Sequence, residues 1–294
     1  MKTPLFTGSM VALITPFKDG KVDEAALKQL IDWQIENGSS VIVPCGSTGE
    51  SATLTHSEHD RVIELTVEHV NRRVKVLAGT GSNATAEAIR LTQHAKDVGA
   101  DGSLLICPYY NKPTQEGLFL HFEAIAKAVD LPQILYNIPG RTGINMTPET
   151  VARLSQVDRI VGIKEATGNL IQASEVIAQC RKDFVLLSGE DALNWPLYTI
   201  GAQGAISVTA NLFPQKCAEM WSCIQKQDLK RGLQLHYELL EINQVLFIET
   251  NPTPVKAALE FMGRCSGDPR LPLTRMKKEN LEKLKQTLKH YQLI

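Results

Sequence analysis

The sequence predicts an α/β fold, a (β/α)8 TIM barrel with a helical extension at the C-terminus. Short apolar runs alternate with segments of helical period eight times along the chain. The runs are apolar on both faces, as the strands of a parallel sheet covered by helices must be. Eight successive β-then-α units within 294 residues are typical of a closed barrel.

Each predicted strand is an apolar run that precedes a helical segment. The predicted strands cover residues 10–16, 40–46, 74–81, 102–108, 132–139, 159–166, 184–191 and 204–211. The predicted helices cover residues 24–38, 56–70, 85–100, 116–129, 147–156, 170–180 and 192–201, with a further helix from about Gln215. We expect residues 1–225 to form the catalytic barrel and residues 226–294 to form a C-terminal helical region.

A doubly wound parallel sheet is the competing fold. Its support is GTGSNA (79–84), which fits the glycine pattern of a dinucleotide-binding turn between a strand and a helix. That pattern also requires an acidic residue at the end of the next strand. Asp101 precedes the next strand instead of closing it. The sequence therefore favours the barrel and argues against nucleotide binding.

The composition argues against several classes of protein. The 31 basic and 32 acidic residues form no basic patch, so we expect no nucleic-acid partner. No apolar stretch approaches the roughly 18 residues of a membrane span, and the N-terminus has no segment of signal-peptide type. We therefore expect a cytoplasmic protein with no membrane partner. The six cysteines include no CxxC pair and predict reduced thiols, with Cys45 and Cys107 as small hydrophobes.

A lysine lies inside an apolar run in the segment IVGIKEATGNL (160–170). Because strand side chains alternate, Glu165 points towards the helices if Lys164 points into the barrel. Lys164 then lacks a paired carboxylate, and desolvation favours the neutral amine that attacks a ketone to form an imine. Tyr136 lies about one βα unit earlier, where it can pass protons. The alternative is a structural lysine whose amine reaches water at the strand end.

The other predicted strand ends carry hydroxyl groups, and one arginine lies in the loop just past Tyr136. The turn 46–49 offers hydroxyls and N–H groups that suit a carboxylate, or is a simple strand-to-loop turn. Arg141 can clamp a second carboxylate, or is an exposed loop arginine. The strand ends hold no histidine and few acids, so we expect no metal site. His56 and His59, three apart on a helix, are typical of a solvated face.

Five segments are informative together: GSTGES (46–51), LLICPYYNKPTQEGL (104–118), LYNIPGRTG (135–143), GIKEATG (162–168) and SGED (188–191). They resemble the pyruvate-dependent class I aldolase superfamily, and most closely its dihydrodipicolinate synthase family. The resemblance covers nearly the whole chain. It implies a Schiff-base-forming lyase that condenses pyruvate with L-aspartate 4-semialdehyde to 4-hydroxy-tetrahydrodipicolinate, in lysine and diaminopimelate biosynthesis.

The resemblance also implies roles for single residues. Lys164 forms the imine with pyruvate without a cofactor, and Tyr136 is the general acid and base. Ser47 and Tyr110 complete a proton relay, with Tyr110 reaching into the site of a neighbouring subunit. The implied assembly is a homotetramer, a dimer of dimers. The implied substrate-binding residues are Thr48 for the pyruvate carboxylate, Arg141 for the semialdehyde carboxylate, and Gly189 and Ile206 through main-chain atoms.

The relay serine is a departure from the family pattern, which most often has threonine at this position. Ser47 keeps the hydroxyl but lacks the β-methyl group that restricts χ1. Serine at this position also occurs in the sialic acid lyases, sister aldolases that do not carry the PGRTG segment around Arg141. A sister aldolase acting on sugar acids is therefore the nearest rival interpretation. A barrel with only a binding or structural role is disfavoured by the presence of both Lys164 and Tyr136.

A regulatory site is the last implication of the resemblance. Lysine-inhibited members of the family bind L-lysine in a cleft between subunits. Every residue type of that cleft is present here, which predicts feedback inhibition by L-lysine. The matching residues are Ser51, Ala52, His56, His59, Asn83, Glu87 and Tyr109.

Overall fold

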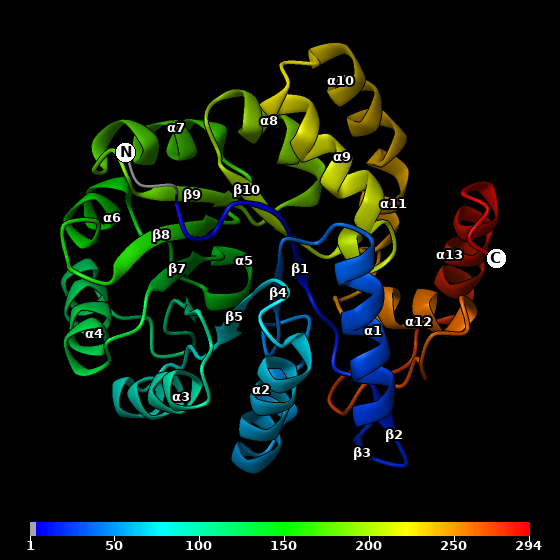
Figure 1. Ribbon diagram of the computed structural model, residues 1–294, viewed down its shortest axis with the longest axis horizontal. Coiled ribbons are helices and arrows are strands. Elements are labelled where there is room, and N and C mark those ends of the chain that lie inside the picture. Colours follow the sequence, from blue (N-terminus) through cyan, green and yellow to red (C-terminus); the bar gives the residue numbers. More distant parts are fainter. Residues whose placement is uncertain (1–3) are drawn as a thin grey trace.

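A computed structural model describes residues 4–294. It shows a closed parallel barrel surrounded by helices (Figure 1). Within these residues, eight strands pair in the order β1-β10-β9-β8-β7-β6-β5-β4, and β4 closes the ring by pairing with β1. The barrel strands are β1 (Gly8–Ala12), β4 (Val41–Val43), β5 (Lys75–Gly79), β6 (Gly102–Ile106), β7 (Gln133–Asn137), β8 (Ile160–Glu165), β9 (Val185–Ser188) and β10 (Gly204–Ser207). The barrel predicted from the sequence is confirmed, and the doubly wound sheet is wrong.

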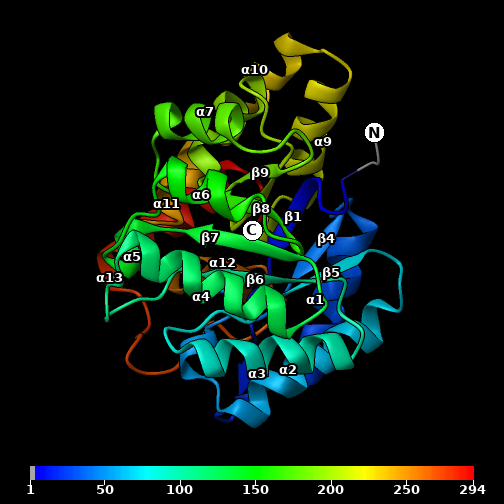
Figure 2. The same ribbon diagram turned by 90° about the vertical axis from the view of Figure 1, so that its left-hand side faces the viewer.

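The predicted helices are present, each within a few residues of its expected bounds. Helices α3, α4 and α6 lie outside strands β6 to β8, as the side view shows (Figure 2). The helices of the barrel units are α1 (Glu24–Glu36), α2 (His56–Val70), α3 (Thr85–Asp97), α4 (Gln115–Ala128), α6 (Pro148–Leu154), α7 (Leu170–Gln179), α8 (Asn194–Thr199) and α9 (Pro214–Gln225). The remaining helices are α10 (Leu229–Glu238), α11 (Leu240–Val245), α12 (Thr253–Phe261) and α13 (Lys278–His290). The division between residues 225 and 226 stays a prediction.

Local sequence explains the bounds of α2. Thr55 accepts a hydrogen bond from the Glu58 N–H, and the Glu58 side chain bonds back to the Thr55 N–H. This capping box satisfies two N–H groups that the first helical turn leaves free. Asn71 then ends the helix in the left-handed conformation. The observed helix therefore matches the predicted range 56–70.

The strands are shorter than predicted, and several small elements were not predicted. The predicted runs continued into loops that remain buried above the barrel, so their apolar character did not mark the strand end. The short helix α5 (Pro139–Thr142) begins where β7 was expected to finish. The hairpin of β2 (Phe17–Lys18) and β3 (Lys21–Val22) follows β1. The other small elements are three single-turn 3₁₀ helices: η1 (Ser51–Thr53), η2 (Asp191–Leu193) and η3 (Thr209–Asn211).

Two apolar clusters show which side chains point into the barrel. The larger cluster lies between strands and helices and includes Val11, Leu105 and Ile163. The smaller cluster fills the barrel interior and includes Ile134 and Tyr136 from β7. The alternation along each strand puts successive residues into different clusters. Because Ile163 belongs to the outer cluster, Lys164 points inward.

The C-terminal helices are joined to the barrel by a buried ion pair. Lys256 on α12 places its Nζ 2.6 Å from Oε1 of Glu50, in the loop after β4, and both side chains are almost fully buried. The Lys256 amine also donates to the main-chain oxygen of Thr15 at 3.1 Å and lies 4.2 Å from the centroid of the Phe17 ring. Burial lowers the pKa of Lys256, and the Glu50 charge opposes this shift.

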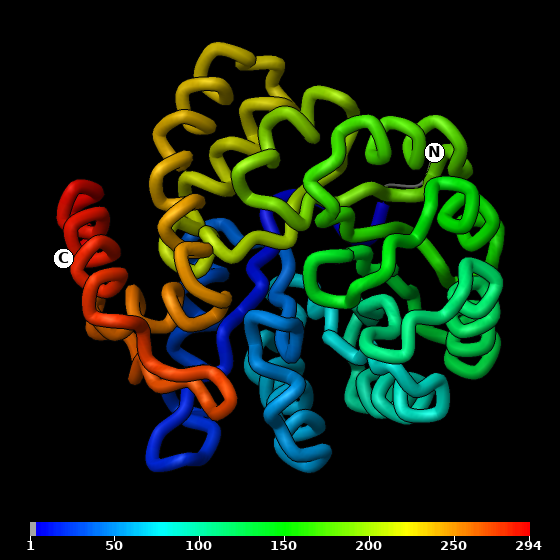
Figure 3. The backbone as a smooth tube through the Cα atoms, turned by 180° about the vertical axis from the view of Figure 1, so that it is seen from behind, coloured from blue at the N-terminus to red at the C-terminus, as the bar shows by residue number. Residues whose placement is uncertain are grey.

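Arg270 extends this cluster towards the N-terminal hairpin. Its main-chain N–H donates to Oε2 of Glu50 at 2.9 Å, and its guanidinium donates to both oxygens of Glu58 at 2.5 and 2.7 Å. These charge-assisted bonds lower the pKa of Glu58 to about 2. Arg270 also bonds to the oxygen of Gly20 at 2.8 Å. Figure 3 shows the resulting arrangement, with the orange segment that precedes the red C-terminal helix lying beside the blue N-terminal part of the chain.

The cysteines are all free thiols. Burial raises the pKa of Cys45 and of Cys107, which keeps both protonated in the core. Both therefore pack as small hydrophobes, as predicted. Across residues 4–294, no helix is long and apolar enough to cross a membrane.

We predict that removing one charge of the buried pair destabilises the protein more than removing both. Lys256→Met leaves the Glu50 carboxylate buried without its partner and should cost about 3–5 kcal/mol of unfolding free energy. Lys256→Met combined with Glu50→Gln should recover part of this loss. The measurement is urea unfolding followed by circular dichroism. Arg153→Met breaks the exposed Arg153–Glu116 pair and serves as the control, with an expected loss below about 1 kcal/mol. A double variant less stable than Lys256→Met contradicts the prediction.

Candidate active site

Lys164 and Tyr136 lie side by side at the carboxyl ends of neighbouring strands. The two residues are register partners in the pairing of β7 with β8. The Lys164 Nζ lies 4.2 Å from the centroid of the Tyr136 ring. Their exposed fractions are 6% and 5%. A primary amine is thus held beside a phenol in a site from which most water is excluded.

Glu165 lies on the other side of the strand from Lys164, as the alternation predicted. Its carboxylate accepts hydrogen bonds from the Thr167 N–H at 2.8 Å and from the Gln172 side chain of α7 at 3.3 Å. Burial raises the pKa of Glu165, and these hydrogen bonds oppose the shift. The carboxylate next to Lys164 in the sequence is therefore used to join β8 to the helix layer.

Glu190 is the carboxyl group that lies on the same side as Lys164. It lines the cavity that contains the amine. Burial, together with the Asp191 charge, raises the pKa of Glu190, and the Lys164 charge opposes the shift. Glu190 lies within the SGED segment but was not among the site residues predicted from the sequence.

Two glycines near Lys164 allow close packing, and one of them, Gly189, leaves the space that the lysine side chain occupies. A Cβ atom on Gly189 would lie 2.9 Å from Cε of Lys164 and 2.7 Å from the Ala166 Cβ. A Cβ on Gly162, one inward position below Lys164, would lie 2.2 Å from the Val185 side chain. Both positions therefore require glycine for close packing.

A cavity of about 60 Å³ contains the amine and most of the predicted substrate-binding residues. Its size suits a molecule of a few heavy atoms. The predicted residues that line it are Ser47, Thr48, Tyr136, Arg141, Lys164, Gly189 and Ile206. The structure thus brings together residues from the ends of β4, β7, β8, β9 and β10 and their following loops.

The loop after β4 is held from three sides. Thr15 donates to the main-chain oxygen of Gly49 at 2.6 Å, and Glu50 is fixed by Lys256 and Arg270. The side-chain amide of Asn251 donates to Oγ1 of Thr48 at 3.0 Å. The main-chain oxygen of Asn251 accepts a hydrogen bond from Arg141 at 2.8 Å. Sequence reasoning missed Asn251, because it predicted only that the segment around it is helical.

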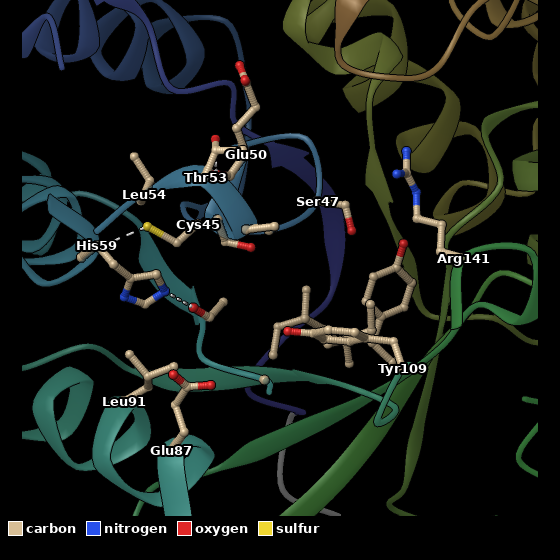
Figure 4. Close-up of a pocket in the computed structure, with 18 of the residues that line it drawn as sticks. Cys45, Ser47, Glu50, Thr53, Leu54, His59, Glu87, Leu91, Tyr109 and Arg141 are labelled. Atoms are coloured by element: carbon tan, nitrogen blue, oxygen red, sulfur yellow. Dashed lines mark hydrogen bonds between the residues drawn. The ribbon is translucent and has the colours of Figure 1, made fainter. Parts of the chain in front are cut away.

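A larger cavity of about 470 Å³ adjoins the small one and shares Ser47, Tyr136 and Arg141 with it. Figure 4 shows Ser47 and Arg141 on one side of this space and Glu87 and His59 on the other. The predicted effector residues that line it are Ser51, Ala52, His56, His59, Glu87 and Tyr109. Asn83 does not line it, but its side chain donates to the main-chain oxygen of Tyr109 at 3.2 Å.

Two glutamates line this cavity, Glu87 and Glu50, and Glu50 is already paired with Lys256. Glu87 has no such lysine partner within hydrogen-bond distance among the described residues. It accepts hydrogen bonds from Ser82 and from Nε2 of His56, the latter at 2.8 Å, and both bonds lower the pKa of Glu87. His56 is exposed, as predicted for a solvated face, but His59 is buried. Burial lowers the pKa of His59 to about 4, and its ring donates to the Gly79 oxygen at 2.9 Å. His59 is therefore neutral near pH 7.

Tyr110 lies apart from the residues around Lys164. Its exposed fraction is 90%, and its φ of 70° is in the left-handed region. Such a backbone conformation is uncommon for a non-glycine residue and turns the side chain away from the strand direction. Within residues 4–294, no group of three or more His, Cys, Asp or Glu side chains is placed to hold a metal ion.

The fold and the site together define a class: a (β/α)8-barrel enzyme with a buried lysine at the carboxyl ends of its strands. The model of the Dihydrodipicolinate synthetase family matches residues 5–291. The chain belongs to this family. A curated relative from Geobacter sp. (strain M21), named 4-hydroxy-tetrahydrodipicolinate synthase, is 57% identical over 99% of this chain and 100% of its own length. The chain is an enzyme of that type, a lyase of lysine biosynthesis.

Solved structures agree with this assignment. The dihydrodipicolinate synthase from Acinetobacter baumannii, described as chloride-inhibited and complexed with pyruvate, is 45% identical. It has a TM-score of 0.96 over 98% of this chain and 99% of its own. The enzyme from Cyanidioschyzon merolae, described with lysine bound, is 40% identical. It has a TM-score of 0.97 over 99% of this chain and 100% of its own.

We predict that Gly189→Ala displaces the Lys164 side chain. The added methyl group lies within the contact distance of Cε, so the amine must leave its place beside Tyr136. The measurement is reduction with borohydride in the presence of pyruvate, which converts any imine on Lys164 into a stable adduct detected by mass spectrometry. The adduct should form at least about tenfold more slowly than in the wild type, a loss equal to about 1.4 kcal/mol.

Gly140→Ala is the matched control for this prediction. Gly140 has no atom within 4 Å of the position of an added Cβ, so alanine fits there without displacing a neighbour. This variant should form the adduct at the wild-type rate. Equal rates for Gly189→Ala and the wild type would show that Lys164 tolerates the methyl group.

Proposed function

We propose that this enzyme condenses pyruvate with L-aspartate 4-semialdehyde through an imine on Lys164. The observation that carries the proposal is the buried amine of Lys164 beside Tyr136 in a cavity of about 60 Å³. The solved relative complexed with pyruvate supports the choice of the first substrate. A lysine that forms the imine itself activates the ketone, so this chemistry needs no metal or organic cofactor.

The first half of the reaction activates pyruvate. The Lys164 Nζ attacks the keto carbon, and the resulting carbinolamine loses water to give the imine. Tyr136 donates a proton to the hydroxyl group, which then leaves as water. Ser47 and Tyr110 form the relay that returns a proton to Tyr136. Thr48 and the adjoining N–H groups hold the pyruvate carboxylate. Gly189 and Ile206 contact the substrate through main-chain atoms.

The second half forms the new carbon–carbon bond. Tyr136 accepts a methyl proton from the imine, which gives an enamine. The enamine carbon attacks the aldehyde carbon of the semialdehyde, and the proton passes to the aldehyde oxygen, which becomes the 4-hydroxyl group. Arg141 binds the carboxylate of this second substrate. The substrate amine then attacks the imine carbon, closes the ring and releases Lys164. The product is 4-hydroxy-tetrahydrodipicolinate.

We also propose a homotetramer, a dimer of dimers, in which Tyr110 completes the relay of a neighbouring subunit. The 90% exposed side chain of Tyr110 and its position apart from Lys164 support this role. The free thiols support a location in the cytoplasm, where the glutathione pool keeps cysteines reduced.

Regulation by L-lysine is the second proposed function. The larger cavity offers the Glu87 carboxylate, whose lowered pKa keeps it charged, to the ammonium groups of lysine. The solved relative described with lysine bound supports the choice of ligand. Ser47, Tyr136 and Arg141 line both cavities, so a ligand in the larger one contacts walls of the active site.

The test of catalysis is pyruvate consumption with and without L-aspartate 4-semialdehyde, combined with borohydride trapping. The wild type should consume pyruvate only when the semialdehyde is present, and should carry a trapped adduct on Lys164. Lys164→Ala should give no adduct and no turnover while keeping the wild-type circular dichroism spectrum. Lys96→Ala, an exposed lysine on α3, is the control and should behave as the wild type. An active Lys164→Ala enzyme overturns the proposal.

The test of regulation is a titration of the initial rate with L-lysine at saturating pyruvate. The rate of the wild type should fall as lysine is added. Glu87→Gln should raise the half-inhibitory concentration by roughly 10-fold or more, since a hydrogen bond to a charged group contributes about 1.5–3 kcal/mol. Glu116→Gln, which changes an exposed glutamate on α4, should leave that concentration unchanged. A flat response of the wild type ends the hypothesis.

A further inference from the structure

Asn251 is a buried residue between the two predicted carboxylate-binding groups. It precedes α12, is 4% exposed and lines both cavities. Its side-chain amide Nδ2 donates to Oγ1 of Thr48 at 3.0 Å. Its main-chain oxygen accepts a hydrogen bond from Nη2 of Arg141 at 2.8 Å. One residue of the C-terminal region thus contacts both groups, through different atoms.

We propose that Asn251 is a positioning residue that makes the Thr48 hydroxyl a hydrogen-bond donor to the carboxylate of pyruvate. A threonine hydroxyl has one proton and two lone pairs. When Nδ2 of Asn251 occupies a lone pair of Oγ1, the hydroxyl proton has to point elsewhere. A bound carboxylate is a pure acceptor and takes that proton. This inference rests on the proposed function, because it assigns the carboxylate at Thr48 to pyruvate.

The surroundings of the amide favour this orientation over its reverse. Among residues 4–294, Oδ1 of Asn251 is buried without a hydrogen-bond partner. If the amide were turned over, Nδ2 with its two N–H groups would instead be the buried group without a partner. A buried oxygen without a partner is more common in folded proteins than a buried N–H donor without one. The arrangement therefore keeps Nδ2 on Thr48.

Substitution can separate the role of the Asn251 side chain from the role of its main-chain oxygen. A change of side chain removes the bond to Thr48, but it leaves the main-chain oxygen that Arg141 binds. The inference therefore predicts an effect on the Michaelis constant of pyruvate and little effect on that of the semialdehyde. A general loss of structure would move both constants together, and so would a displaced Arg141.

The decisive comparison is between Asn251→Ala and Asn251→Asp. Alanine frees the hydroxyl, which can then rotate, and should raise the pyruvate KM about 3- to 10-fold, the effect of one neutral hydrogen bond. Aspartate accepts the hydroxyl proton and repels the substrate carboxylate, so it should raise the pyruvate KM roughly 10- to 100-fold. Both variants should keep the KM of L-aspartate 4-semialdehyde within about twofold of the wild type, on the same scale of interaction energies.

Thr48→Val provides the test of mechanism, because it removes the hydroxyl that Asn251 is proposed to orient. In this background Asn251→Ala should add little further change in pyruvate KM. If Asn251→Ala costs as much with valine at 48 as with threonine, the effect does not pass through Thr48 and the inference is wrong. A pyruvate KM for Asn251→Asp equal to that of the wild type also overturns it, because Thr48 would then donate to residue 251.

Borohydride trapping separates failure of this inference from failure of the proposed function. If the wild type gives no pyruvate adduct on Lys164, the proposed function itself is wrong. If the wild type and both Asn251 variants give the adduct at the same pyruvate concentration, catalysis stands and the positioning role of Asn251 is refuted. Circular dichroism and thermal unfolding establish that each variant is folded. If Asn251→Asp does not fold, Asn251→Ala still tests the inference, because it buries no charge.

Discussion

The buried ion pair between Glu50 and Lys256 is the contact on which the geometry of both cavities depends. It joins α12 of the C-terminal region to the loop after β4, and two unpaired charges at that depth would each cost several kcal/mol. Glu50 holds a left-handed backbone conformation, with φ of 53°, at the end of the turn that carries Ser47 and Thr48. The ion pair therefore fixes the direction in which this turn presents its hydroxyl groups.

The same constraint explains why the C-terminal region contributes to the site. Asn251 lies just before α12 and Lys256 lies in its first turn, and both contact the loop after β4. A barrel alone leaves this loop open on its outer side. Because Arg270 also binds Glu50 and Glu58, the segment between α12 and α13 covers the edge of the larger cavity, where Pro272 and Leu273 line it.

Sequence periodicity predicted the part of the site that the barrel strands determine. Tyr136 and Lys164 were expected side by side because one βα unit separates them, and the register of β7 and β8 confirms that position. The direction of Glu165 followed from strand alternation. Asn251 and Lys256 could not be predicted in this way, because their contacts with Thr48 and Glu50 span more than 200 residues and depend on helix packing. For this contact, the local signal in the sequence was Lys256 in the otherwise apolar segment PTPVKAAL.

The backbone around Ser47 is fixed by its neighbours, so the missing methyl group affects only the side-chain rotation of this residue. The Glu50 N–H closes the turn by donating to the Ser47 oxygen at 3.2 Å, and Thr15 holds the Gly49 oxygen at 2.6 Å. With the backbone fixed, χ1 of Ser47 is the freedom that remains for its hydroxyl. Confining one side chain to one of three rotamers costs about 0.6 kcal/mol at most. That is about a threefold effect on a rate at most, so serine in place of threonine is compatible with a working proton relay.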